Sequence, residues 1–457
     1  MRRRELSLKS IAAASLFALW SCACVSNPEK TTASPPSFVL IVVDTLRSDR
    51  LHYAGYEKAE SPAIDQLAGE STSFERAYAT ASWTIPSVAS LFLSQLGFEH
   101  RMVVFGSALR KDQVTLVEQL SAAGYETAGF VSNPLLDEAS GFEKRFGTYE
   151  YMIYPESDGM ELTNRALGWL GSLRRQEVEE KRENPFFLYV HYMEPHLPYL
   201  CLTEDNTTCP EDPETLTKRL YGGSWKFSEK EKLLIHELYD LEVHHLDQVI
   251  QSLLSGLEAL DLGETWVVFT SDHGELLGED GRYTHGGTLV EELIHVPLLI
   301  RNPRPKSGSI DVPVSLIDVA PTILDLAGIE LPASFRGRSL AGSLRGEELA
   351  PETILAELHR AKPGAFGAKL NDSLDPIDRL AVINGDSKVV LRQDGAIAEF
   401  NLATDRKERS PRRVDEAHLV EKLGKLRGKI DFEGEAEAVR PMNRETLKRL
   451  QVLGYVP

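Results

Sequence analysis

In the segment FVLIVVD, residues 38–44, six consecutive apolar residues end in a single aspartate. An unbroken run of β-branched and large apolar residues is typical of a strand that is covered on both faces. Similar runs recur at residues 125–133, 185–192, 265–272 and 296–302. The pattern therefore predicts a central sheet of buried strands, with Asp44 at the end of its first strand.

Amphipathic stretches separate these runs and are the expected helices, at residues 64–72, 115–124, 162–173 and 229–260. Alternation of buried strands with helices indicates an α/β domain, a mostly parallel sheet with helices on both faces. After this domain, residues 38–345, the pattern changes to short strands separated by Gly and Asp turns, at 380–385, 388–393 and 397–402. An amphipathic segment at 445–455 closes the chain, so residues 346–457 are expected to form a smaller α+β subdomain.

The first 37 residues are expected to direct and anchor the protein. Residues 1–21 combine a basic start with an apolar stretch too short to span a bilayer, as in a signal peptide. They end before Cys22 in a segment that resembles a bacterial lipoprotein cleavage box; ordinary signal cleavage nearby is the alternative. Residues 22–37 are expected to be a flexible tether. The interpretation is an exported lipoprotein of a bacterial cell envelope, on its periplasmic or outer-membrane side.

Composition limits the partners. The chain has 457 residues, 42% of them hydrophobic, and a formal charge of −19. The length permits a large core, and the acidic balance argues against nucleic acid as a partner, so contact with a membrane is expected only through the lipid. Cys201 and Cys209 flank an acidic segment, and in an exported protein a disulfide between them is expected; two free thiols are the alternative.

Polar side chains stand at or near the ends of several predicted strands. They are Asp44, His191, Asp272 and His273, followed in nearby segments by His196 and His285. A single terminal aspartate is often a helix N-cap, and a single histidine is often structural. In parallel α/β sheets, however, ligands bind beyond the carboxyl ends of the strands. Two carboxylates, an imidazole and a hydroxyl would suit a divalent metal ion, and the remaining histidines would bind an anion or move protons.

The segment SWTIPSVASL, residues 82–91, allows two interpretations of Thr84. In the first, Thr84 or Ser87 is an ordinary N-cap of a helix that begins around Ser87. In the second, a divalent cation activates the Thr84 hydroxyl as a nucleophile. Pro86 suits the first turn of such a helix, whose N–H groups would face an incoming anion.

Several motifs, taken together and in order, resemble the sulfatase family of the alkaline phosphatase superfamily. They are FVLIVVDTLRSDRL, SPAIDQLA, SWTIPSVASL, YVHYMEPHLPY, TSDHGELLGEDGRYTHGG and VPVSLIDVAPTILDLAGI. The resemblance covers essentially the whole chain from Phe38 to the C-terminal LGY. It implies an alkaline phosphatase-like fold and a metal-dependent site for anionic sulfate or phosphate esters, with one divalent cation: Mn²⁺, Zn²⁺, Ca²⁺ or Mg²⁺.

When the chain is matched to the family residue by residue, the metal ligands are retained, but the residues of the sulfate site differ. Asp44 matches the first metal aspartate, and Asp272 and His273 match the later metal pair. Thr84 stands where sulfatases have a Cys or Ser that becomes formylglycine, and its β-methyl group prevents that conversion. Charged residues of the sulfate site are replaced by Thr45, Val88, Ser132 or Asn133, and Gly286 with Gly287.

Retained metal ligands together with a threonine at the formylglycine position make the chain similar to phosphoethanolamine transferases and lipoteichoic acid synthases. These enzymes use an unmodified threonine that also binds the metal. The resemblance makes Thr84 the expected nucleophile and fourth metal ligand, with His196 or His285 protonating the leaving oxygen. Arg47 is expected either to contact substrate or to cap the first helix, and His191 either to contact substrate or to be structural.

Two functions follow. The first is an exported, metal-dependent hydrolase or phosphotransferase for sulfuric or phosphoric esters, leaning to phosphate, with an envelope glycan or lipid head group as the expected substrate. The alternative is a catalytically degenerate lipoprotein that keeps the fold and binds glycans or an envelope partner.

Overall fold

The computed structural model describes most of one compact unit, Pro35–Pro457. The described residues are 35–180, 184–199, 213–222, 225–359, 378–392, 395–414, 417–418 and 421. Cys22, Cys201, Cys209 and the predicted helix at 445–455 lie outside them, as do the signal peptide and nearly all of the tether. The lipid anchor and the disulfide therefore stay predictions.

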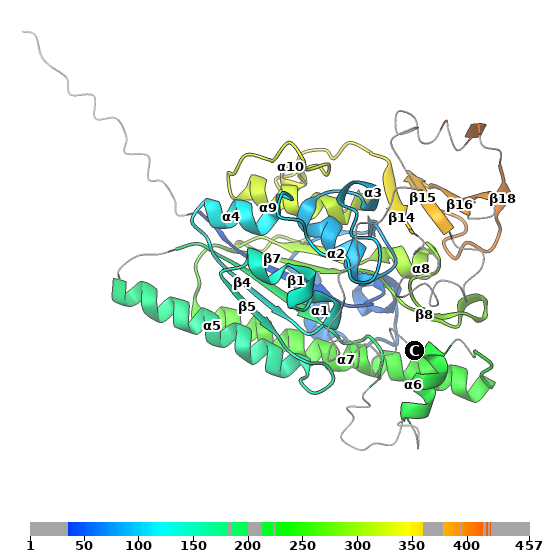
Figure 1. The fold of residues 1–457 in the computed structure, drawn as a ribbon, viewed down its shortest axis with the longest axis horizontal. Coiled ribbons are helices and arrows are strands. Elements are labelled where there is room, and N and C mark those ends of the chain that lie inside the picture. The colour runs from blue at the N-terminus through cyan, green and yellow to red at the C-terminus, as the bar shows by residue number, and fades with distance from the viewer. Residues whose placement is uncertain are drawn as a thin grey trace, which may run out of the picture. The chain divides into compact units, whose positions relative to one another are not determined.

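Among the described residues, an eight-stranded sheet forms the centre of the fold, in the order β12-β2-β11-β7-β1-β6-β4-β5 (Figure 1). Its strands are β1 (Ser37–Val43), β2 (Thr72–Phe74), β4 (Glu126–Val131), β5 (Thr148–Tyr151), β6 (Phe186–Tyr192), β7 (Thr265–Ser271), β11 (Leu298–Arg301) and β12 (Gly308–Ile310). All five predicted buried runs form strands of this sheet, so the predicted α/β architecture is confirmed.

Strand β1 is covered on both faces, as its composition predicts. Phe38, Leu40 and Val42 belong to one hydrophobic cluster, and the alternate residues belong to the other. Figure 1 shows α2, α4 and α9 on one side of the sheet and α5 and α7 on the other. The longer helices are α1 (Pro62–Gly69), α2 (Thr84–Leu93), α4 (Leu116–Ala122), α5 (Gly159–Glu180), α6 (Pro213–Tyr221), α7 (Glu229–Leu260) and α9 (Val319–Leu326).

Shorter elements complete the connections. Single-turn α-helices are α3 (Gly97–His100), α8 (Glu291–Ile294) and α10 (Ala341–Leu344). The 3-10 helices are η1 (Ser48–Arg50), η2 (His52–Ala54), η3 (Pro134–Leu136), η4 (Glu138–Ser140), η5 (Glu143–Arg145), η6 (Glu279–Gly281) and η7 (Leu316–Asp318). The small strands are β3 (Ala77–Tyr78), β8 (Leu276–Leu277), β9 (Tyr283–Thr284), β10 (His295–Val296) and β13 (Val314–Ser315).

One predicted strand runs against the parallel direction. β11 pairs antiparallel with both β7 and β2, whereas β7, β1, β6, β4 and β5 pair in parallel. The chain between β7 and β11 contains only short elements, and it re-enters the sheet from the edge at which β7 ended. An antiparallel neighbour needs no crossover helix, so this connection reverses the strand.

The C-terminal part forms a separate antiparallel sheet, as predicted for 380–402. Its order is β14 (Ile354–Glu357), β15 (Asp378–Asn384), β16 (Ser387–Arg392), β17 (Ile397–Asn401) and β18 (Arg412–Arg413). Lys388 of β16 is fully buried and forms ion pairs with Glu291 of α8 at 2.9 Å and with Glu408 at 2.6 Å. These three side chains, the Lys388 triad, connect the small sheet to the larger domain.

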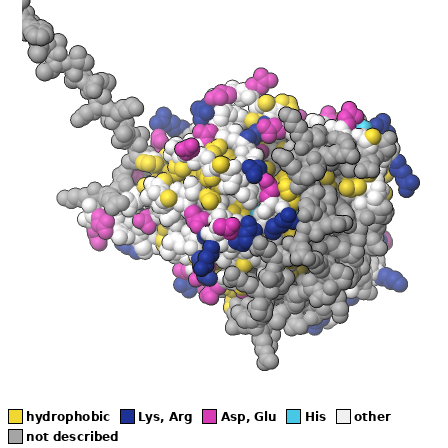
Figure 2. Space-filling view, turned by 45° about the horizontal axis from the view of Figure 1, so that its top comes forward, with side chains coloured by type: hydrophobic (Ala, Val, Ile, Leu, Met, Phe, Trp, Pro, Cys, Tyr) yellow, Lys and Arg dark blue, Asp and Glu magenta, His cyan; other side chains and the backbone are white. Residues whose placement is uncertain are grey.

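The surface carries charges of both signs. Figure 2 shows Asp and Glu side chains interspersed with Lys, Arg and apolar side chains over the described part of one face. Within the described residues, no helix combines the length and the hydropathy that a bilayer crossing requires.

Candidate active site

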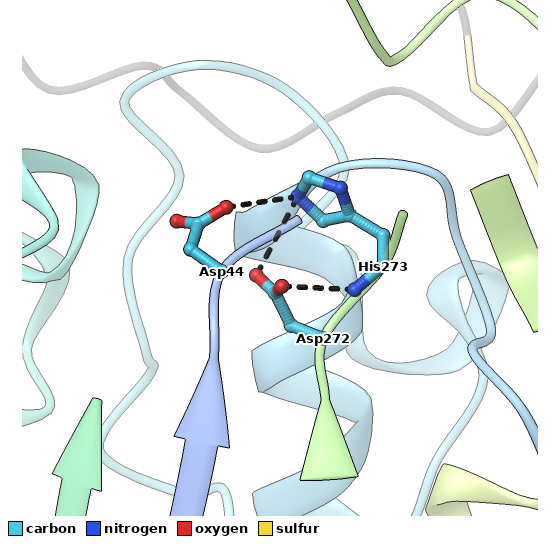
Figure 3. Close-up of side chains that lie close together, drawn as sticks. All are labelled: Asp44, Asp272 and His273. Atoms are coloured by element: carbon cyan, nitrogen blue, oxygen red, sulfur yellow. Dashed lines mark hydrogen bonds and ion pairs between the residues drawn. The ribbon is translucent and has the colours of Figure 1, made fainter. Parts of the chain in front are cut away.

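Two neighbouring strands bring the predicted metal ligands together. β1 and β7 pair in parallel with Val43 opposite Ser271, so the residues that follow them leave the sheet side by side. Asp44, Asp272 and His273 meet there and are fully buried (Figure 3). The His273 Nε2 atom lies 3.6 Å from Asp44 Oδ1 and 3.5 Å from Asp272 Oδ2.

The protonation of His273 leaves a lone pair facing two carboxylates. Its Nδ1 lies 2.9 Å from the Gly274 carbonyl oxygen, which can only accept, so Nδ1 carries the proton. Burial and the neighbouring His285 lower the pKa of His273 to about 3, so the ring is neutral at neutral pH. Among the described residues, neither Asp44 Oδ1 nor Asp272 Oδ2 has a hydrogen-bond partner. Three electron-rich atoms therefore converge, an arrangement that a cation would stabilise.

The spacing of these atoms also fits a metal ion. Ligand atoms about 2.1 Å from a tetrahedrally coordinated cation lie about 3.4 Å from each other. The two His273 distances, 3.5 Å and 3.6 Å, are close to this value and too long for good hydrogen bonds. The donor set therefore fits the divalent cation that the resemblance to sulfatases implies, although it does not select among Mn²⁺, Zn²⁺, Ca²⁺ and Mg²⁺.

The two carboxylates have opposite electrostatic surroundings. Burial raises the pKa of Asp272, and the neighbouring Asp44 raises it further. Burial acts in the same direction on Asp44, but His196, His191 and His273 outweigh it and hold the pKa of Asp44 below its usual range. Of the two, Asp44 is the carboxylate that its neighbours keep charged.

Thr84 lies inside this cluster. It is fully buried, and its Oγ1 lies 3.4 Å from His273 Nε2, the same spacing as the metal ligands. Helix α2 begins at Thr84 itself, three residues earlier than expected, and Trp83 in extended conformation is its N-cap. Ser87 Oγ donates to the Asp272 carbonyl oxygen at 2.6 Å. The interpretation of Thr84 or Ser87 as a simple N-cap is therefore wrong.

Asn133 also belongs to the cluster, although no role of its own was predicted for it from the sequence. It follows β4, is fully buried, and its Nδ2 donates to Asp44 Oδ2 and to Thr84 Oγ1, the latter at 3.3 Å. The sequence placed Ser132 or Asn133 only where sulfatases have a lysine. The signal that would have found Asn133 is its place just beyond a buried strand, which it shares with Asp44.

The two loop histidines approach the cluster from different segments. The His285 ring centroid lies 4.6 Å from that of His273 and 5.1 Å from that of His196. His285 Nδ1 lies 3.2 Å from Glu275 Oε1, and Glu275 outweighs burial and raises the pKa of His285. Burial lowers the pKa of His196, whose Nδ1 contacts the Leu197 carbonyl oxygen.

His191 and Arg47 lie close to the cluster but have other contacts. His191 Nδ1 hydrogen-bonds to Tyr189 Oη at 2.7 Å, and its Nε2 lies 3.6 Å from Asp44 Oδ2. The Arg47 guanidinium is buried. It binds the Asp49 carboxylate at 2.8 Å, the Glu279 carboxylate at 2.7 Å and the Glu275 backbone carbonyl oxygen at 3.0 Å. Substrate contact by either residue stays a prediction.

The family model and the relatives that match this chain all point to the same family. A family model described as Sulfatase matches residues 36–329, a range that contains the whole cluster. The N-acetylglucosamine-6-O-sulfatase of Bacteroides thetaiotaomicron is 25% identical, in a match that covers 73% of this chain and 75% of that protein. The ulvan-active sulfatase of Formosa agariphila is 25% identical, in a match that covers 75% of this chain and 72% of that protein.

A solved structure shows the same fold. The phosphonate monoester hydrolase of Agrobacterium radiobacter superposes with a TM-score of 0.68 and 18% identity. The match covers 85% of this chain and 94% of the hydrolase. The likeness confirms the predicted alkaline phosphatase-like fold.

Proposed function

Since this chain belongs to the sulfatase family, and is therefore an enzyme for sulfuric or phosphoric esters, we propose that Thr84 is its nucleophile. A divalent cation at Asp44, Asp272 and His273 would polarise the threonine hydroxyl and offset the charge of the ester. The observation that carries the proposal is the position of Thr84 Oγ1, 3.4 Å from His273 Nε2.

The proposed reaction has two steps. Thr84 Oγ1 loses its proton to solvent and forms a bond to the sulfur or phosphorus atom, while the bond to the ester oxygen breaks. His285 or His196 gives a proton to the leaving alcohol, since both rings border the cluster. Water then cleaves the ester at Thr84, restores the hydroxyl and releases the sulfate or phosphate; a second alcohol in place of water gives transfer.

The proposal leans to phosphate esters. A threonine cannot become the formylglycine aldehyde, because its β-carbon carries a methyl group. The resemblance to sulfatases leads us to expect charged residues at several positions that are uncharged here: Thr45, Val88, Ser132 or Asn133, and Gly286 with Gly287. Hydrolysis of sulfate esters by the unmodified threonine is the second outcome that the assay must be able to detect.

The place of action and the natural substrate are part of the proposal. The signal-like residues 1–21 and Cys22 support an exported lipoprotein, attached to a bacterial envelope membrane by its lipid. Two relatives carry names that refer to a sulfated sugar and to the polysaccharide ulvan. An envelope glycan or lipid head group that bears an anionic ester is accordingly the proposed substrate.

The test compares the purified chain with two variants on aryl sulfate, phosphate monoester and phosphodiester substrates. Each assay is run with EDTA and with added Mn²⁺, Zn²⁺, Ca²⁺ or Mg²⁺. Thr84→Ala should keep the bound metal but lower kcat by at least about 10³-fold, because the nucleophile is gone. Asp272→Ala should lose both metal and turnover.

Thr84→Ser is the matched control, since it keeps a hydroxyl at the same position and should retain measurable turnover. Full turnover in Thr84→Ala would exclude a threonine nucleophile. Wild-type protein that binds no metal and cleaves none of the three esters would contradict the proposed function as a whole.

A further inference from the structure

Asn133 touches two of the groups on which the proposed reaction depends. It stands two residues beyond Val131, the last residue of β4, and its side chain has no exposed surface. Its amide nitrogen donates to Asp44 Oδ2 and, at 3.3 Å, to Thr84 Oγ1. It therefore joins the predicted nucleophile to a predicted metal ligand from a third strand of the sheet.

The backbone fixes which way this amide faces. Asn133 Oδ1 accepts the Leu135 N–H at 2.7 Å and so caps the 3-10 helix η3. A reversed amide would place its NH₂ group against that N–H and its oxygen against the Asp44 carboxylate. Both contacts would be repulsive, so the NH₂ group has to face Asp44 and Thr84.

We propose that Asn133 is a positioning residue that holds the Thr84 oxygen and the Asp44 carboxylate in their reactive arrangement. The inference rests on the proposed function, because it gives a partner to the same nucleophile. One N–H of Asn133 fixes the direction of the Thr84 hydroxyl. The same N–H stabilises the negative charge that develops on Thr84 Oγ1 as its proton leaves.

The contact with Asp44 gives the two carboxylate oxygens different tasks. Oδ2 accepts from Asn133, whereas Oδ1 faces His273 Nε2 at 3.6 Å and has no hydrogen-bond partner among the described residues. Asn133 thereby anchors one oxygen and leaves the other for a cation.

The kinetic test uses the full chain with Asn133→Ala and Asn133→Asp. The aspartate variant keeps the size of the side chain and the cap on Leu135, but it has no N–H for Thr84. Both variants should lower kcat by about 10- to 100-fold, the usual effect of losing a hydrogen bond to a developing charge. KM should stay within about threefold of the wild type, because Asn133 acts through Thr84 and Asp44 rather than through bound substrate.

A matched control separates the proposed positioning role of Asn133 from its local role as a backbone cap. Asn302 also caps a backbone N–H two residues ahead, since its Oδ1 accepts from Arg304 at 2.9 Å. It follows β11 at the end of the sheet away from the site, where Arg301 pairs with Val267. Asn302→Ala and Asn302→Asp should leave kcat unchanged within about twofold, while kcat within twofold of wild type in both Asn133 variants would overturn the proposal.

Metal binding provides a readout that does not need turnover. Calorimetry with Mn²⁺ should show affinity about 10- to 100-fold lower for Asn133→Ala than for wild type, because Asp44 loses the donor that orients it. Asn302→Ala should bind as the wild type does. If the wild type binds Mn²⁺ but cleaves no ester, the proposed function fails, while a reduced affinity in Asn133→Ala still supports the part of the inference that concerns Asp44. Equal affinities of Asn133→Ala and wild type would overturn it.

Discussion

Individual buried polar groups determine the chemistry of this site, since each needs a partner or has to change its charge. Asp44 Oδ1, Asp272 Oδ2 and His191 Nε2 are buried and have no hydrogen-bond partner in the part of the chain that the structure describes. Asn133, by contrast, uses both ends of its amide. Asp44 Oδ1 and Asp272 Oδ2 both lie close to His273 Nε2, and this is the arrangement expected of a metal site rather than of a hydrophobic core.

Glu194 shows the same principle outside the metal cluster. It is fully buried in the loop after β6, and its Oε1 accepts the Gly159 N–H at 2.7 Å at the start of α5. Burial raises the pKa of Glu194 from 4.5 to about 7. The folded protein therefore holds this proton more tightly than the unfolded chain does.

The raised pKa of Glu194 determines how the stability of the protein depends on pH. Because the folded pKa lies above the unfolded value, the stability contributed by Glu194 is greatest below pH 4.5 and is lost as the pH rises to about 7. Glu194→Gln keeps the acceptor but not the charge. Between pH 5 and pH 8 the wild type should lose on the order of 2 kcal/mol of unfolding free energy relative to this variant, measured by urea denaturation. Parallel pH profiles for the two proteins would contradict this prediction.

At the scale of elements, the loop that leaves β7 is held tightly against α8. The Gly274 N–H donates to the Leu293 carbonyl oxygen at 2.8 Å. A Cβ atom at Gly274 would lie 2.0 Å from the Glu292 carbonyl oxygen, which belongs to the backbone and cannot turn aside. The absence of a side chain at Gly274 therefore lets the loop carry His273 into the site.

Gly274→Ala should push this loop away from α8 and displace His273. We expect unfolding free energy to fall by about 1–3 kcal/mol and Mn²⁺ affinity to fall by at least about tenfold, measured by denaturation and by calorimetry. Gly168→Ala in α5 is the control, because no atom lies within 4 Å of its Cβ position and alanine favours a helix. Unchanged metal affinity in Gly274→Ala would show that the loop has room to adapt.

At the scale of the whole molecule, the Lys388 triad links the C-terminal sheet to the larger domain. Lys388 and the two glutamates are almost entirely buried, and Tyr78 Oη also donates to Glu291 at 3.4 Å. Buried ion pairs add little net stability compared with apolar packing, but removal of one partner leaves a buried charge without compensation.

Lys388→Met should therefore destabilise the protein by about 3–5 kcal/mol, because Glu291 and Glu408 would face each other without a cation. Thermal and chemical denaturation would measure the loss. Arg304→Met is the surface control, since Arg304 pairs with Glu264 in an exposed position and should change stability little. A Lys388→Met variant as stable as the control would mean that the two glutamates share a proton without penalty.

The strands and the ligands at their ends could be predicted from local composition alone. The apolar run before Asp44 and the run before Asp272 each specify a buried strand locally, and parallel strands deliver their following residues to one edge. The metal cluster of Asp44, Asp272 and His273 could be anticipated for this reason. The C-terminal strands were predictable in the same way from short apolar runs between turns.

The contacts between loops could not be predicted, because they form between separate segments of the chain. The donor from Asn133 to Thr84 joins residues 49 positions apart, and Glu275 meets His285 across a turn whose path no local pattern fixes. The antiparallel direction of β11 and the start of α2 at Thr84 likewise depend on how the chain returns to the sheet. Strand formation depends on short-range composition, whereas these contacts depend on the positions of separate segments, which are set only when the core packs.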